Sequence, residues 1–430
     1  MAVKNAPSFR KDLPRIACIG AEALTHSHGT GLMFSRHLAR YPRSKIVDVH
    51  YQALATNFVF PKVKVPVCEL RNMEWNDPML ADLNSLMQKG HRRPGTSFVY
   101  QGRMFGNGLI NWDKLGGTPD LIYSTCYSAR DFAFLHHIYR NLPKKVPIVQ
   151  HFLDLDFNFI ETLKSLYKEL EPAIVAVWAL NESIRGAVRN LTGNDVKIDL
   201  KLALHQPVSR VFKQTHRGFC PDDFSSIMIG NVWSGTAYLA LHRAWSDCQD
   251  ELRGLPPIEW MGHSRRFREL AHMGFRWTPG GGVVENGGYL SSAALKKALV
   301  GADLAIIPFS GEKADREDYN SYSLPSRLGD YCMAGLPVVV ISQPNTEPAR
   351  YVRDFGLGIV VDPAEWRISV KKLKHFILDR DWREECGTNA RRFAERTLDL
   401  ESYQDELYPR LTELARARIP SVRLERHFFP

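Results

Sequence analysis

Short apolar runs alternate with amphipathic helical patterns along most of the chain. The first series begins with an apolar strand over residues 15–20 and a helix over 32–40, and it ends with a strand over 196–204. Between them we expect strands at 46–51, 121–124, 146–152 and 174–178, and helices at 129–139 and 181–191. Strands that alternate with helices predict a parallel sheet, which binds ligands at the carboxyl edge of its strands.

The same alternation restarts after residue 225. It predicts strands at 226–230, 258–261, 304–309, 338–341 and 356–361, and helices at 237–252, 293–299, 366–376, 382–397 and 400–417. The predicted fold class is therefore α/β, with two Rossmann-like doubly wound domains. The expected domains are 1–207 and 223–399, joined by a hinge at 208–222. Pro207, Gly218 and Pro221 lie in or next to this hinge and disfavour regular structure there. A helix at 400–417 and a basic, aromatic tail at 418–430 follow the second domain.

The segment from Ser323 to Ile341 predicts a short helix that leads through a glycine stop into a buried strand. Pro325 suits the first helical turn, and Gly335 with Pro337 ends the helix before an apolar β-branched run. A helix start offers free amide donors and the positive end of the helix dipole, so it favours an anion such as a diphosphate. This junction predicts a nucleotide site.

Three polar residues share one face of this helix. Asp330 lies three positions after Arg327 and four after Ser326, so all three can share this face. We assign Arg327 and the amides near Ser323 to a diphosphate, and Asp330 to the hydroxyls of a ribose. Ser326 belongs to the same predicted nucleotide site. The alternative is an ordinary helix-to-strand turn with a charged outer face.

The string Pro-Ser-Arg-Leu-Gly-Asp-Tyr-Cys-Met-Ala-Gly-Leu-Pro-Val, which begins at Pro325, resembles the donor-site helix of GT-B glycosyltransferases, above all the retaining family four. Arg327 and Asp330 stand where that motif has Lys and Glu. The resemblance extends over roughly residues 15–414. It implies two Rossmann-like domains that face a cleft, and a last helix that crosses back to the first domain.

The resemblance also implies an activity. The expected enzyme is a hexosyltransferase-like glycosyltransferase that moves a sugar from a nucleotide-diphosphate sugar to a hydroxyl acceptor, which is a glycan, a lipid-linked molecule or a small molecule. The resemblance implies that the reaction retains the configuration of the sugar and needs neither a metal nor another cofactor. If the enzyme inverts instead, it needs a base, and Asp154, Asp156 and His151 are the candidates.

The chain departs from the family pattern at the expected diphosphate contacts. The family has Gly-Arg and then Lys-Gly after the first strand of the second domain, whereas here Gly230 is followed by Asn231 and neither basic residue is present. Arg327 or Arg265 can supply the missing charge. The first of the family's paired glutamates falls on Tyr322. A non-catalytic nucleotide-sugar-binding or scaffold protein with a degenerate GT-B fold is therefore an alternative, as is an epimerase.

Two features of the first domain point to the same chemistry. Gly29, Thr30 and Gly31 form a loop whose small side chains let backbone amides approach a ligand, or a tight turn needed only for helix packing. The third glycine of a dinucleotide fingerprint is absent, which disfavours NAD. His151 ends an apolar strand and resembles the family-four histidine that contacts the transferred sugar, so we assign it the catalytic role. The alternative is a histidine that caps a turn.

Asp154 and Asp156 spell the Asp-x-Asp string with which GT-A enzymes hold a divalent metal. Two similar halves fit GT-A poorly, so we expect no metal site. The seven cysteines are scattered and include no Cys-x-x-Cys pair, which indicates reduced thiols and no zinc site.

Composition sets the expected compartment and partners. Of the 430 residues, 44% are hydrophobic and 24% are charged, as in globular proteins. The sequence has no apolar run near the roughly 20 residues that cross a bilayer, and no secretory signal. We therefore expect the protein in the cytoplasm. The formal net charge is +9 and is spread over several clusters, including 371–374 and the tail. This charge has two interpretations: the protein contacts the inner surface of an anionic membrane, or its basic surface is simply solvated. No nucleic-acid recognition motif is present, so nucleic acid is not an expected partner.

Overall fold

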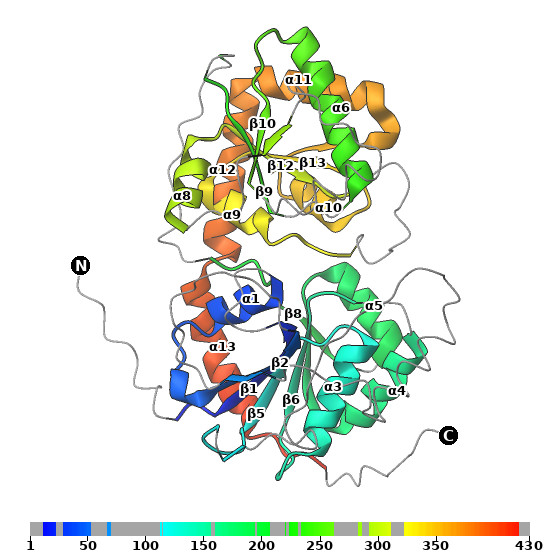
Figure 1. Ribbon diagram of the computed structural model, residues 1–430, viewed down its shortest axis with the longest axis vertical. Coiled ribbons are helices and arrows are strands. Elements are labelled where there is room, and N and C mark those ends of the chain that lie inside the picture. Colours follow the sequence, from blue (N-terminus) through cyan, green and yellow to red (C-terminus); the bar gives the residue numbers. More distant parts are fainter. Residues whose placement is uncertain are drawn as a thin grey trace, which may run out of the picture. The chain divides into compact units, whose positions relative to one another are not determined.

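The structure of the 430-residue chain is a computed structural model. It describes residues 12–22, 29–52, 67–69, 112–113, 115–155, 160–193, 196–206, 220, 223–230, 234–261, 283–285, 292–310 and 322–420. The chain forms two compact units (Figure 1). Unit 1 consists of Met1–Ala203 and Ser402–Pro430, and unit 2 of Leu204–Glu401.

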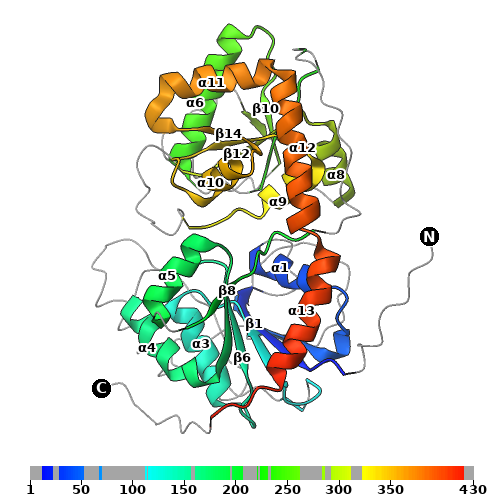
Figure 2. The ribbon, with the colours of Figure 1, turned by 180° about the vertical axis from the view of Figure 1, so that it is seen from behind.

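Unit 1 contains a parallel sheet with the strand order β3-β2-β1-β5-β6-β7-β8 in the described part of the chain. Helices α1 and α13 cover one face of this sheet, and α3, α4 and α5 cover the other (Figure 2). The elements are β1 (Ile16–Glu22), α1 (Gly29–His37), β2 (Ile46–Gln52), β3 (Val67–Glu69), β5 (Leu121–Ser124), α3 (Ala129–Arg140), β6 (Ile148–Phe152), α4 (Ile160–Leu170), β7 (Ile174–Ala179), α5 (Glu182–Thr192), β8 (Ile198–Leu200) and α13 (Leu400–Ala415).

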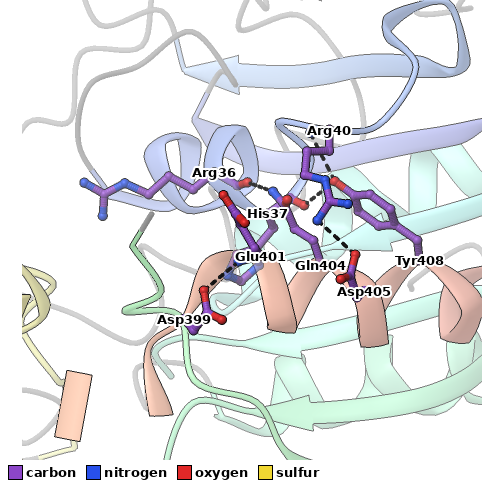
Figure 3. Close-up of polar contacts among 8 residues, drawn as sticks. All are labelled: Arg36, His37, Arg40, Asp399, Glu401, Gln404, Asp405 and Tyr408. Carbon is purple, nitrogen blue, oxygen red and sulfur yellow. Dashed lines mark hydrogen bonds and ion pairs between the residues drawn. The ribbon is translucent and has the colours of Figure 1, made fainter. Parts of the chain in front are cut away.

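Helix α13, the last of the described elements, completes the core of unit 1. Its apolar residues Leu407 and Leu411 are buried in the same cluster as strands β1 and β5. Polar contacts fix it on α1 (Figure 3): Gln404 Nε2 donates to the carbonyl of Arg36 at 2.7 Å, and the Tyr408 hydroxyl donates to the carbonyl of His37 at 3.0 Å. A segment distant in sequence therefore closes one face of the first sheet.

Unit 2 contains a second parallel sheet, with the order β11-β10-β9-β12-β13-β14 in the described part of the chain. This is the doubly wound order of a dinucleotide-binding fold, and its direction reverses between β9 and β12. The elements are β9 (Ser226–Ile229), α6 (Gly235–Glu251), β10 (Ile258–Met261), β11 (Val283–Glu285), α8 (Ser292–Gly301), β12 (Leu304–Pro308), α9 (Arg327–Ala334), β13 (Val338–Ile341), α10 (Glu347–Asp354), β14 (Gly358–Val361), α11 (Trp366–Leu378) and α12 (Arg380–Thr397).

Local sequence explains how α9 joins β13. The helix ends at Gly335, whose φ of 67° lies in the left-handed region that a residue without a Cβ adopts at no steric cost. The amide of Leu336 then donates to the carbonyl of Tyr331 at 3.0 Å. Strand β13 follows with four fully buried residues, because a strand inside a parallel sheet is covered on both faces.

The structure confirms the α/β class and the two doubly wound sheets. It corrects the expectation for Gly29, Thr30 and Gly31, which form the first turn of α1 rather than a loop before it. Helices α4 and α10 and the short strands β3 and β11 were not predicted.

In the part of the chain that the structure describes, no helix has both the length and the apolar character needed to cross a membrane.

Candidate functional site

The reversal of strand order between β9 and β12 marks the place in unit 2 where a ligand is expected. In open α/β sheets the crevice lies outside the carboxyl ends of the two strands on either side of this point. Strand β9 ends at Ile229, and the chain then turns at Gly230, which has a φ of +81°. The indole Nε1 of Trp260 donates to the carbonyl of Gly230 at 2.8 Å and holds this turn.

Tyr331 ties helix α9 to both strands. Its hydroxyl accepts a hydrogen bond from the amide of Ile229 at 2.8 Å and donates to the carbonyl of Ile306 at 3.3 Å. The side chain is completely buried, and this burial raises the pKa of Tyr331 well above its ordinary value. A hydroxyl that bridges β9 and β12 holds α9 directly at the reversal point.

Arg327 is the first residue of α9 and points toward the turn after β9. A Cβ built on Gly230 would lie 3.8 Å from Cζ of the Arg327 guanidinium and 3.9 Å from its Nε. The residue is only 6% exposed, and this desolvation lowers the pKa of Arg327, although the nearby Tyr331 opposes the shift. A guanidinium still remains protonated in a protein. The structure therefore brings Gly230 and Arg327, two residues predicted separately, to one place.

The other predicted residues of this helix lie around its first turn. Asp330 and Ser323 are half-buried, and Ser326 is exposed. Ser326 makes no side-chain cap, and the amides of Leu328 and Gly329 donate to the carbonyls of Pro325 and Ser326 at 3.0 and 3.1 Å. Because these amides are used within the turn, the positive charge that the site offers comes mainly from the Arg327 side chain.

The back of α9 rests on the backbone of the chain that enters unit 2. A Cβ on Gly329 would lie only 2.6 Å from the carbonyl oxygen of Leu204, so only glycine permits this approach. The segment itself is fixed by backbone hydrogen bonds, from Gln206 to the carbonyl of Leu398 at 2.9 Å and from Leu400 to the carbonyl of Gln206 at 3.0 Å. Sequence reasoning did not identify Gly329, because its partner is distant along the chain.

Hydroxyl groups gather at the carboxyl ends of β12 and β13, which adjoin the same edge. Ser310 Oγ lies 3.0 Å from Ser342 Oγ, which lies 2.6 Å from Thr346 Oγ1, and the amide of Gln343 donates to Ser310 Oγ at 3.1 Å. Sequence analysis assigned none of these four residues to the site. Each follows an apolar strand at its carboxyl end, and that position was the available signal.

His151 lies in the interior of unit 1. Its Nε2 is 2.9 Å from the carbonyl oxygen of Lys201, and its Nδ1 is 3.1 Å from the hydroxyl of Tyr123. Since a carbonyl only accepts, Nε2 carries the proton and Nδ1 accepts from the tyrosine. Burial lowers the pKa of His151 to about 4, so the ring is neutral at neutral pH. Both ring nitrogens are therefore hydrogen-bonded inside unit 1, and contact of His151 with a sugar stays a prediction.

The remaining residues predicted from the sequence lie outside the candidate site around α9, or outside the described part of the chain. Gly29, Thr30 and Gly31 begin α1 at the carboxyl end of β1, where the first amides of a helix face outward. Asp154 is half-buried, and its carboxylate accepts from the amide of Leu155 at 3.0 Å. Arg265 and Asp156 lie outside the described residues. No group of three or more metal-ligating side chains gathers among the residues that the structure describes.

Comparison with known proteins rests on structure, because no protein-family model matches the chain and no curated protein matches its sequence. Solved glycosyltransferase structures match nearly its whole length. The Anabaena HepE structure in complex with UDP and glucose is 13% identical with a TM-score of 0.60, over 93% of this chain and 99% of that one. The chain has the GT-B fold.

Two further neighbours agree with this assignment of the GT-B fold. An E. coli trehalose-6-phosphate structure bound with UDP-2-fluoro glucose is 11% identical with a TM-score of 0.61, over 94% of this chain and 100% of that one. WaaG, a glycosyltransferase involved in lipopolysaccharide biosynthesis, is 13% identical with a TM-score of 0.52, over 92% and 99%. The predicted α/β class with two Rossmann-like domains is thus confirmed.

Proposed function

We propose that this protein is a glycosyltransferase that moves a hexose-like sugar from a nucleotide-diphosphate sugar to a hydroxyl acceptor. The observation that carries the proposal is the buried guanidinium of Arg327 beside Gly230, with Asp330 in the same helical turn. The GT-B fold supports it, because neighbours with this fold are described as bound with UDP and glucose and with UDP-2-fluoro glucose.

The chemistry suits a site that offers a fixed cation. When the bond between sugar and phosphate breaks, negative charge develops on the departing nucleoside diphosphate. A preorganised guanidinium in a water-poor site stabilises that charge without reorganising during the reaction. In this proposal Arg327 supplies the charge that the sequence lacks after Gly230, Ser323 and Ser326 contact the phosphates, and Asp330 accepts hydrogen bonds from the ribose hydroxyls.

The proposed reaction retains configuration and uses no metal. The acceptor hydroxyl transfers its proton to the departing phosphate on the same face of the sugar, so the chain need not supply a strong base. His151 is a poor base in this setting, because its Nδ1 accepts from Tyr123 and its Nε2 donates to Lys201. The acceptor classes are a glycan, a lipid-linked molecule or a small molecule, and the proposed compartment is the cytoplasm.

The alternative is a non-catalytic protein that binds a nucleotide sugar. It is favoured by one observation, the absence of a basic residue after Gly230 where the family carries two. A catalytic and a non-catalytic protein share the donor site and differ only in turnover. Binding and turnover must therefore be measured separately.

The test is a thermal-shift panel of nucleoside diphosphates followed by a turnover assay. A ligand that binds only the native state raises the melting temperature by mass action, so we expect one nucleoside diphosphate to do so without added magnesium or manganese. Its diphosphosugar should then be consumed, with the sugar joined to an acceptor. Binding without consumption would select the non-catalytic alternative, and strict metal dependence would instead favour a metal site at Asp154 and Asp156. Failure of every nucleotide to bind would overturn the proposal.

A further inference from the structure

Helix α11 presents a basic and apolar face to solvent. Its other side is buried in the core of unit 2 through Val370, Leu373, Phe376 and Ile377. The exposed residues recur three or four positions apart, so they share one face of the helix. This α11 face consists of Arg367, Ile368, Lys371, Lys372, His375 and Leu378.

The cations of the α11 face are available to an external partner. Arg367, Lys371 and Lys372 are exposed and make no hydrogen bond or ion pair with the residues that the structure describes. The neighbouring Lys374 differs, because it pairs with Glu251 of α6 and lies off the face. At the two ends of the α11 face, Asp379 lies 3.9 Å from His375 Nε2 and Glu365 precedes the helix. Between these ends, the carboxylate of Glu251 is paired with Lys374 and not with Lys371 or Lys372. Its centre is thus positively charged.

Two large aliphatic side chains flank these cations. Ile368 is 66% exposed and Leu378 is 45% exposed. They are ten positions apart, which is about 15 Å along a helix axis. Cations between exposed aliphatic residues are typical of a helix that lies in the boundary between lipid headgroups and acyl chains. The face has no Phe, Tyr or Trp on which a nucleic-acid base could stack, which favours lipid over a single-stranded nucleic acid.

We propose that the α11 face binds the surface of an anionic lipid bilayer. The cations contact the headgroups, while Ile368 and Leu378 enter the apolar boundary. Helices α11 and α9 lie at opposite ends of unit 2 (Figures 1 and 2), so this surface is separate from the candidate nucleotide site. The proposal therefore stands or fails independently of the proposed function.

The first experiment measures sedimentation of the full chain with vesicles of phosphatidylcholine, alone or mixed with phosphatidylglycerol. One cation near an anionic surface contributes about fivefold in affinity, so Lys371→Gln/Lys372→Gln should weaken binding to the mixed vesicles roughly twentyfold. The control Arg392→Gln/Arg396→Gln makes the same change of charge at exposed positions of α12 and should leave binding within about twofold. Equal loss in both variants, or no loss in the first, would overturn the proposal.

The second experiment tests the apolar contact. Ile368→Ser should weaken binding to the mixed vesicles about tenfold, also at high salt, because the contact it removes is not electrostatic. The control Val300→Ser removes another exposed aliphatic residue, on α8, and should leave binding unchanged. If Ile368→Ser has no effect while soluble heparin binds with the same dependence on Lys371 and Lys372, the partner is a soluble polyanion and the lipid assignment is wrong. Circular dichroism shows that each variant is folded.

Discussion

Asp330 is the residue whose replacement tests the proposed ribose contact most directly. Hydrogen bonds to a charged group contribute about 1.5 to 3 kcal/mol, so Asp330→Ala should weaken the affinity for the best nucleotide ten- to a hundredfold. Asp330→Asn keeps the shape and part of the hydrogen bonding and should lie between the two. Calorimetric titration measures the dissociation constants.

A matched control for Asp330 exists in α12. Asp381 is also an aspartate in the first turn of a helix, and it is exposed. Asp381→Ala should leave nucleotide affinity unchanged. Equal dissociation constants for wild type, Asp330→Ala and Asp381→Ala would show that α9 does not hold the ribose.

The lowered pKa of His151 predicts that the free energy of unfolding depends on pH. Its folded-state pKa of about 4 lies below the ordinary value of 6.5, so below pH 6.5 the unfolded chain binds a proton that the folded chain does not. The stability linked to His151 is therefore complete above pH 6.5 and is lost between pH 6.5 and 4. This loss amounts to about 3 kcal/mol in the free energy of unfolding.

Urea unfolding at several pH values between 7 and 4 measures this effect. His151→Gln should be less stable than wild type at pH 7, since buried hydrogen bonds are lost, but its stability should fall less as the pH decreases. His375→Gln, which replaces an exposed histidine, should keep the wild-type dependence. A His151→Gln curve parallel to that of wild type would contradict the prediction.

At the scale of elements, the position of α9 depends on its contact with the segment that enters unit 2. Gly329→Ala places a Cβ 2.6 Å from the Leu204 carbonyl oxygen, so the helix or the segment must shift. We expect unit 2 to lose about 1 to 3 kcal/mol of unfolding free energy. Nucleotide affinity should fall as well, because Arg327 moves with the helix.

Gly186→Ala is the matched control for this prediction. Gly186 lies inside α5, and a Cβ there meets nothing within 4 Å. Alanine should therefore stabilise that helix by about 0.5 to 1 kcal/mol. Urea unfolding compares the two variants, and opposite signs are expected. A stabilising Gly329→Ala would show that the contact with Leu204 is not tight.

At the scale of the whole molecule, each unit repeats one scheme. Both sheets are parallel and reverse their strand order once, between β1 and β5 in unit 1 and between β9 and β12 in unit 2. The last helix, α13, belongs to the core of unit 1 although it follows unit 2 in the chain. This return places Gln404 and Tyr408 on α1, more than 360 positions away in sequence. The core of unit 1 therefore contains residues from segments that precede and follow unit 2 in the sequence.

The sequence by itself determined the elements whose signals are local. Strands β5, β10 and β13 lie at their predicted residues, because each is a short, mostly apolar segment between turn residues. The end of α9 was equally predictable, since Gly335 and Pro337 act through their own backbone geometry. Helix α4 carries the readable apolar spacing Leu163, Leu166, Tyr167 and Leu170, but was not identified.

Only the tertiary structure decided which residues meet. Strands β3 and β11 have three residues each, and their pairing with a neighbour defines them more than their sequence does. The Tyr331 hydroxyl bridges two strands, and Gly329 makes room for Leu204, in contacts that join residues from 25 to 125 positions apart. The pattern of apolar residues along the sequence indicates which face of a helix or strand is buried. A binding site depends instead on distances between different elements, and these distances are set only when the elements pack together in the folded chain.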